Sequence, residues 1–217
     1  MLPSHDIQRR PRLRDQVYEA LRAMIRAGAF PPEGAVESQL AAHLNVSRTP
    51  VREALFQLCR EFMLEDTGRG YRVPGLSEAD MREIIELRMM IEPPATALAI
   101  ARTGQAALPA LRGALDAEEM AHRDGDLDGF AAANSRFRAR ILESCANARV
   151  SQTLALMDDQ VQRLRLRTLG IADNRALTLR GHAAIIDAFD REDPDSGAQA
   201  MRDILEAAGR FYAGLSR

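Results

Sequence analysis

The chain has 217 residues and a mass of 24.0 kDa, and 46% of its residues are hydrophobic and 28% charged. This composition excludes a disordered or fibrous protein and is sufficient for one sizeable core or two modest domains. The 29 basic residues nearly balance the 31 acidic ones, so a polycationic coat protein is excluded and any contact with nucleic acid must be local.

The first part of the chain shows the order of elements found in winged helix-turn-helix domains. Apolar residues recur at spacings of three and four between Pro11 and Gly28, which predicts a first helix, and a short helix is predicted from Glu37 to Leu44. Ser47 is placed to cap a third helix. The predicted buried faces of the first and third helices consist of Leu13, Val17, Leu21, Met24 and Ile25, and of Val51, Leu55, Leu58 and Phe62.

A β-hairpin is predicted after the third helix. Residues 63–66 and 71–73 flank the segment Thr67-Gly68-Arg69-Gly70, whose glycines suit a tight turn. Three helices followed by a hairpin form a winged helix-turn-helix, which we assign to residues 1–75. Those residues carry 11 Arg against 9 Asp and Glu, a net charge of +2, whereas the remainder carries 18 against 22, a net charge of −4.

Residues 46–55 form the most informative motif, Val-Ser-Arg-Thr-Pro-Val-Arg-Glu-Ala-Leu. The motif resembles the start of the recognition helix in the GntR family of bacterial transcription regulators. With the preceding helix and the hairpin, the resemblance covers about residues 11–74 and implies binding to double-stranded DNA.

The chemistry of the motif agrees with that implication. A helix that enters the major groove needs small or hydrogen-bonding residues at its leading end, with donors for phosphates and base edges. The residues that meet this need are Ser47, Arg48, Thr49 and Arg52. At the hairpin tip, Arg69 and Gly70 are predicted to reach a phosphate or a minor groove. The alternative for each arginine is a solvated surface charge.

Only helical periodicity follows the break at Pro74-Gly75. Ser77 and Asp80 form a predicted N-terminal cap, and later breaks imply about six helices and no second sheet. These breaks lie near Gly104, Gly125, Asn147, Gly170 and Pro194. We therefore expect a mainly α fold, with an all-helical domain at residues 76–217.

This second domain resembles the all-helical, FCD-type effector-binding domain of the FadR subfamily. The resemblance rests on Glu86-Leu87-Arg88 with Glu92, the Asn134 to Arg138 segment, Gly181-His182 before Ile185-Ile186, and Ala200-Met201-Arg202. Many members hold a divalent metal at positions that correspond here to Asn134, Arg138, His182 and Ile204. Because only one of these four is a good ligand, we expect neither a metal nor another cofactor.

Polar residues on otherwise apolar helical faces suggest what replaces the metal. We interpret Arg88, Asn134, Arg138 and His182 as an effector site for a small anionic molecule, such as a carboxylate held by a guanidinium. Arg88 could instead pair with Glu92 or another helix, and His182 could be a hydrogen-bonded core histidine. Periodicity alone does not separate Arg138 from Arg140 as the residue at the edge of the pocket.

These features together predict a ligand-responsive transcription regulator, more readily a repressor than an activator. A symmetric homodimer would present two recognition helices to a palindromic operator. One alternative is a regulator whose helical domain only dimerises. Another is an enzyme with an accessory DNA-binding domain, although the sequence has no nucleophile elbow, phosphate-binding glycine loop or metal-ligand set.

The predicted compartment is the cytoplasm, with no membrane attachment. The two cysteines, Cys59 and Cys145, are far apart in sequence, which argues against a disulfide framework. The N-terminal segment lacks the apolar core of a secretion signal, and no apolar run approaches the roughly 18 residues of a membrane span.

Overall fold

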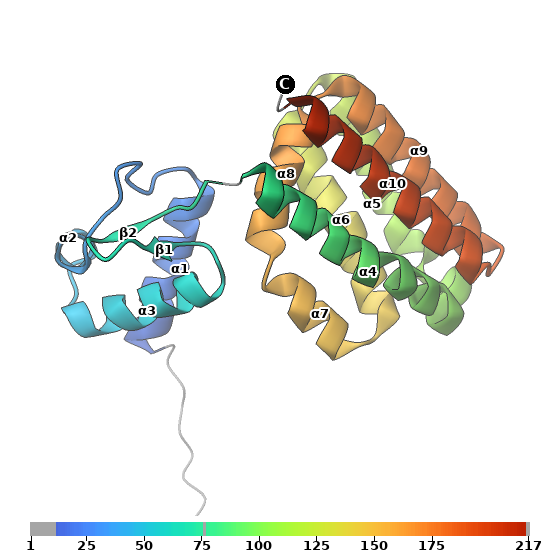
Figure 1. Cartoon of the computed structure of the whole chain (residues 1–217). Coiled ribbons are helices and arrows are strands. Elements are labelled where there is room, and N and C mark those ends of the chain that lie inside the picture. Colours follow the sequence, from blue (N-terminus) through green and yellow to red (C-terminus); the bar gives the residue numbers. More distant parts are fainter. Residues whose placement is uncertain (1–11, 76, 216–217) are drawn as a thin grey trace, which may run out of the picture. The chain divides into compact units, whose positions relative to one another are not determined.

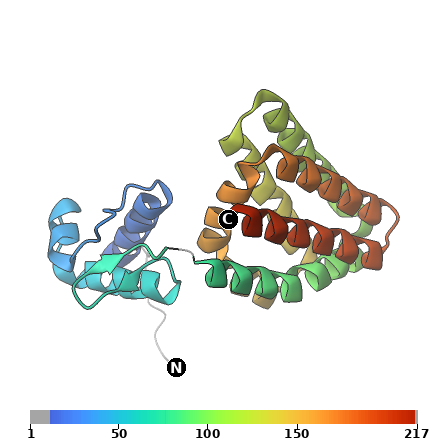
Figure 2. The same cartoon turned by 45° about the horizontal axis from the view of Figure 1, so that its top comes forward.

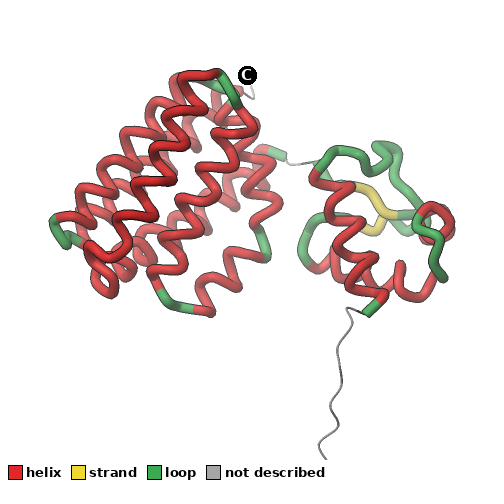
Figure 3. The backbone as a smooth tube through the Cα atoms, turned by 180° about the vertical axis from the view of Figure 1, so that it is seen from behind, coloured by secondary structure: helices red, strands yellow, loops and turns green. Residues whose placement is uncertain are grey.

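A computed structural model of the chain describes residues 12–75 and 77–215 (Figure 1). The chain divides into two compact units, Met1–Gly75 and Leu76–Arg217. Helices dominate both, and the one sheet in the described ranges has two strands (Figure 3). The predicted mainly α fold is therefore confirmed. None of the helices within these ranges combines the length and the apolar sequence that a bilayer span requires.

Three helices enclose the core of the N-terminal unit: α1 Leu13–Arg26, α2 Glu37–His43 and α3 Arg48–Arg60. α1 packs against α3 through the apolar faces that the periodicity predicts, because residues three and four apart lie on the same side of a helix. The fully enclosed residues include Val17 and Leu21 of α1 and Val51, Leu55 and Leu58 of α3. The polar ends of α3 are consequently left on the outside.

Two residues of the predicted faces lie outside this core. Leu13 is the first residue of α1 and is 49% exposed. Phe62 is 63% exposed, because α3 ends at Arg60 and Phe62 adopts a left-handed backbone conformation with a φ of 56°. The helical period therefore no longer determines which way its side chain points.

The predicted hairpin is confirmed and is attached to the loop before α2. Strand β1, Glu65–Asp66, pairs antiparallel with β2, Tyr71–Arg72. Ala35 and Tyr71 exchange two backbone hydrogen bonds of 2.8 Å each. A Cβ atom on Gly70 would lie 2.9 Å from the carbonyl oxygen of Ala35, so this contact requires glycine. This hairpin is the wing of the domain, and the contact with Ala35 holds it close to the start of α2.

The second unit contains seven α-helices and one 3-10 turn within residues 77–215, one α-helix more than predicted. They are α4 Glu78–Thr103, the turn Gly104–Ala107, α5 Leu108–Asp124, α6 Leu127–Cys145, α7 Ala148–Ala155, α8 Asp158–Leu169, α9 Ala172–Asp190 and α10 Pro194–Leu215. The additional break lies at Leu156 and Met157, where neither glycine nor proline marks the sequence. The capping pair before α4 is confirmed, because Asp80 N donates to Ser77 Oγ and Ser77 N to Asp80 Oδ2.

The long helices pack around a shared apolar core. α10 lies against both α4 and α9, and α6 lies against α4 and α5 (Figure 2). Phe137, Ile141, Phe189 and Leu205 are among the core residues with at most 1% exposure. Gly181 lets α9 approach α10 closely, since a Cβ there would come within 2.3 Å of Ile204 Cγ1. This packing brings the polar residues of α4, α6, α8 and α9 toward one region.

Candidate nucleic-acid interface and ligand cavity

The leading end of α3 presents its polar side chains to solvent. Ser47, Arg48, Thr49 and Arg52 are all exposed, and the side chains of the two arginines are each 63% exposed. Ser47 occupies the N-cap position, but its hydroxyl makes no capping hydrogen bond. The hydroxyl groups and guanidinium groups of this helix end can therefore meet an external acceptor while the apolar side stays in the core.

Glu37, the first residue of α2, holds the two arginines together. Arg52 donates from Nε and Nη2 to the two Glu37 carboxylate oxygens at 2.8 Å each, and Arg48 Nη2 donates at 3.3 Å. The hydrogen bond from Arg52 lowers the pKa of Glu37 and raises the pKa of Arg52. This pairing leaves other N–H groups of both guanidinium groups free. Sequence reasoning missed Glu37, because its contact crosses from one helix to the next.

The wing supplies a further cation. Arg69 lies exposed at the hairpin tip, and within the described residues no ion pair occupies its guanidinium. Gly70 is half-buried against Ala35, so its small size serves the packing of the wing. Arg69 is therefore the side chain of this turn that is available to a phosphate.

In the helical unit, the four predicted effector residues line one cavity. Arg88 from α4, Asn134 and Arg138 from α6, and His182 from α9 all lie on its wall, together with Ile204 from α10. The wall also includes Arg165 and Thr168 of α8 and Asn174 and Thr178 of α9. The volume is about 30 Å³, enough for roughly two or three water molecules. The arrangement is polar on several sides but narrow.

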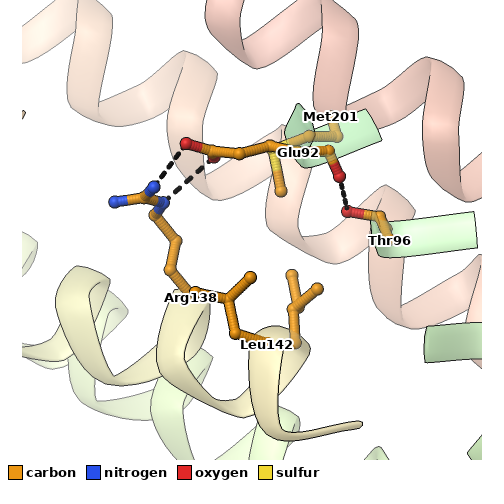
Figure 4. Close-up of a pocket in the computed structure, with 6 residues that line it drawn as sticks. Glu92, Thr96, Arg138, Leu142 and Met201 are labelled. Atoms are coloured by element: carbon orange, nitrogen blue, oxygen red, sulfur yellow. Dashed lines mark hydrogen bonds and ion pairs between the residues drawn. The ribbon is translucent and has the colours of Figure 1, made fainter. Parts of the chain in front are cut away.

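Glu92 neutralises the cavity's two predicted cations, and Figure 4 shows its ion pair with Arg138. Arg88 Nε donates to Glu92 Oε1 at 2.7 Å, and Arg138 forms a second, two-pronged ion pair with the same carboxylate. Burial opposes ionisation of Glu92, but the charges and hydrogen bonds of Arg138 and Arg88 outweigh it and lower its pKa to about 2. Arg140 is half-exposed and pairs with Glu143 on its own helix, so Arg138 is the cavity residue.

His182 is held from two sides. Its Nδ1 lies 2.8 Å from Glu118 Oε2, and its ring stacks on Phe137 with the ring centroids 3.8 Å apart. Glu118 and His182 are 0% and 1% exposed. His182 is therefore a hydrogen-bonded core histidine at Nδ1. It also lines the cavity, and Nε2 is the ring nitrogen that another partner could use.

Sequence reasoning missed four further polar residues of the wall: Arg165, Thr168, Asn174 and Thr178. Arg165 is 5% exposed on α8, and Asn174 is 2% exposed on α9. Asn174, Thr178 and His182 are spaced four residues apart and so form a polar row on one face of α9. That spacing is the signal that could have identified Asn174.

The residues at the family's metal position do not suit a metal. The guanidinium of Arg138 and the alkyl side chain of Ile204 offer no lone pair, so only Asn134 and His182 among the four positions could donate to a metal. Within the described residues no group of three or more His, Cys, Asp or Glu side chains is arranged to hold an ion.

Comparisons with known proteins agree with the division of the chain. Residues 13–73 match the family described as "Bacterial regulatory proteins, gntR family", and residues 83–207 match the FCD domain. The HTH-type transcriptional regulator YdhC of Bacillus subtilis (strain 168) is 29% identical over 188 residues, which cover 85% of this chain and 84% of that protein.

A second relative is named as a D-xylose utilization operon transcriptional repressor of Paenarthrobacter nicotinovorans. It is 29% identical over 195 residues, covering 88% of this chain and 85% of the relative. The solved structure of Escherichia coli McbR/YncC has a TM-score of 0.71 and 24% identity, over 94% of this chain and 98% of that one, and shows the same fold. This chain belongs to the GntR family of bacterial regulatory proteins, with an FCD domain after its DNA-binding domain, and is a DNA-binding transcription regulator.

Proposed function

We propose that this regulator is a repressor that binds a palindromic operator as a homodimer. The leading end of α3, with Ser47, Arg48, Thr49 and Arg52, enters the major groove, and the wing tip at Arg69 and Gly70 reaches a phosphate or the adjacent minor groove. The observation that carries this proposal is the 63% exposure of both arginine side chains on a helix whose opposite face is enclosed. The repressor named among the relatives supports the sign of the control.

We further propose that a small anionic metabolite in the helical cavity controls operator affinity. Asn134 and His182 hydrogen-bond the ligand, and Arg88 and Arg138 form the charged wall that Glu92 holds in place. Arg88 and Glu92 both lie on α4, the helix that follows Gly75 in sequence. A ligand can alter DNA binding only if it binds one arrangement of the protein better than another.

The test begins with genomic DNA fragments captured by the purified protein and sequenced. Fluorescence anisotropy on the recovered duplex should show tight, salt-dependent binding by two chains per duplex. Sugar acids, dicarboxylates, amino acids and aromatic acids are then added to the complex, and one class should shift the operator affinity. Recovery of no sequence above background would refute the operator proposal, and an unchanged affinity with every acid would refute the metabolite proposal.

A second candidate has an observation in its favour. The cavity of about 30 Å³ is small for a metabolite, as expected if the helical domain only dimerises. In that case the dimer would persist, and the operator affinity would stay constant, whichever acid is added.

A further inference from the structure

One arginine of the cavity lacks the partner that the others have. Arg165 Nη1 donates to Ser135 Oγ at 3.3 Å and to Gln162 Oε1 at 3.1 Å, both neutral acceptors. Its Nη2 is completely buried and has no hydrogen-bond partner among the described residues. An unpaired buried donor on a charged group is costly, and this nitrogen belongs to a residue that lines the cavity, so an anion that reached it would satisfy it.

The other two arginines do not share this deficit. Arg88 and Arg138 both bind the carboxylate of Glu92, which is 3% exposed. One anion there serves two cations, and no carboxylate in the described part of the chain pairs with Arg165. An incoming anion would therefore gain more from Arg165 than from displacing Glu92.

Two carboxamides define the rest of the ligand. Asn134 and Asn174 are 5% and 2% exposed and line the same cavity, and neither side chain forms a hydrogen bond within the part of the chain that the structure describes. A carboxamide offers both donors and an acceptor, and a hydroxyl group has the same dual character. Neutral hydroxyl groups are thus the natural partners for these two residues.

A second carboxylate on the ligand is disfavoured. Glu118 lies behind His182, and its Oε1 is buried with no hydrogen-bond partner in the described ranges. The Glu92 carboxylate lies behind the cavity wall, where it is paired with Arg138. Another anionic group placed near either would be repelled.

We propose that Arg165 binds the carboxylate of a small hydroxylated monocarboxylate, whose hydroxyl groups are bound by Asn134 and Asn174. This assignment rests on the proposed metabolite control and gives it a ligand class. It assigns carboxylate binding to Arg165 and not to Arg88 or Arg138. Because the cavity is only about 30 Å³, it must widen to admit such a ligand, and we therefore limit the probes to three carbon atoms.

Four three-carbon probes separate the contributions: glycerate, propionate, malonate and glycerol. Isothermal titration of the purified full chain should show that glycerate binds most tightly. Propionate, which lacks hydroxyl groups, should bind about tenfold more weakly because it loses the neutral hydrogen bonds to Asn134 and Asn174. Glycerol loses the charged hydrogen bond to Arg165, and the second carboxylate of malonate is repelled, so both should bind more weakly still. Equal binding of all three acids, or no binding of glycerate, would overturn the proposal.

Arg165→Met should lower glycerate affinity by about 10- to 100-fold. Arg140→Met, which removes an exposed arginine paired with Glu143, is the matched control and should bind as the parent does. Because Nη2 has no partner, Arg165→Met should unfold at the same temperature as the ligand-free parent or higher. Arg165→Lys keeps the charge without the fork and should give an intermediate affinity. Parental affinity in Arg165→Met would disprove the assignment.

The two proposals fail in different ways. If an acid releases the operator from the parent and from Arg165→Met equally, the metabolite control stands and the role of Arg165 is wrong. If glycerate binds through Arg165 but leaves operator affinity unchanged, the site stands and the control proposal fails.

Discussion

Among the described residues, each unit of this chain contains a group in which one glutamate pairs with two arginines. In the DNA-binding unit Glu37 joins Arg48 and Arg52, whose side chains are 63% exposed. In the helical unit Glu92 joins Arg88 and Arg138, whose side chains are 5% and 11% exposed. The pairing is similar, and the surroundings differ.

Burial decides what each group can do. At the surface, water screens the ion pair and the arginines keep free N–H groups that face outward, so they can bind another molecule. In the interior, removal of Glu92 leaves two guanidinium groups without water or a counter-charge, so the group holds its three helix positions in place instead of binding another molecule. An arginine count therefore does not identify a binding site until burial and pairing are known.

The largest expected effect is on the buried group. Glu92→Gln leaves Arg88 and Arg138 buried without a counter-charge and should lower the free energy of unfolding of the helical unit by ~3–5 kcal/mol. Chemical denaturation followed by circular dichroism measures the loss. The triple variant Arg88→Met, Glu92→Met, Arg138→Met should recover most of it, because no buried charge remains. If Glu92→Gln were as stable as the parent, the ion pairs of Glu92 with Arg88 and Arg138 would not stabilise the fold.

Acid should weaken the same group. The pKa of Glu92 lies at about 2, below its usual 4.5. A depressed carboxyl pKa stabilises the fold above pH 4.5, and that contribution is lost as the pH falls from about 4.5 to about 2. The loss should be on the order of 3 kcal/mol, from ~1.4 kcal/mol per pKa unit. The parent should therefore lose more stability across this window than the triple methionine variant, and parallel curves would contradict the assignment.

The exposed group should act on DNA rather than on folding. Arg52→Ala should weaken operator binding by ~1–3 kcal/mol and reduce discrimination between operator and mutated operator, as expected for loss of a base contact. Arg60→Ala, at the far end of the same helix, is the control and should change affinity little. Anisotropy at matched salt gives both values. A uniform loss on all duplexes would instead assign Arg52 to a phosphate.

The sequence predicts features that depend on neighbouring residues, but not the pairing of side chains from distant helices. Periodicity and the motif at residues 46–55 gave the helices, the hairpin and the exposed end of α3, because these depend on neighbours in sequence. The four residues predicted to converge, Arg88, Asn134, Arg138 and His182, line one cavity, and their role in binding an effector stays a prediction. Which arginine lacks a partner depends on contacts between distant helices, such as that of Glu92 with Arg138, and only the folded chain shows them.

The smallest expected effect on stability is that of Glu37→Gln, which makes at the surface the same change that Glu92→Gln makes in the interior. Glu37→Gln should change the free energy of unfolding by less than ~1 kcal/mol, since the arginines it pairs with remain solvated. It should also loosen Arg48 and Arg52 and lower the ratio of operator to random-DNA affinity. Glu53→Gln, which changes the charge of exposed α3 equally, is the control. That control should raise affinity for both duplexes and leave their ratio unchanged. If both variants behave alike, Glu37 acts only through its charge, and the surface group holds no side chain in place for DNA.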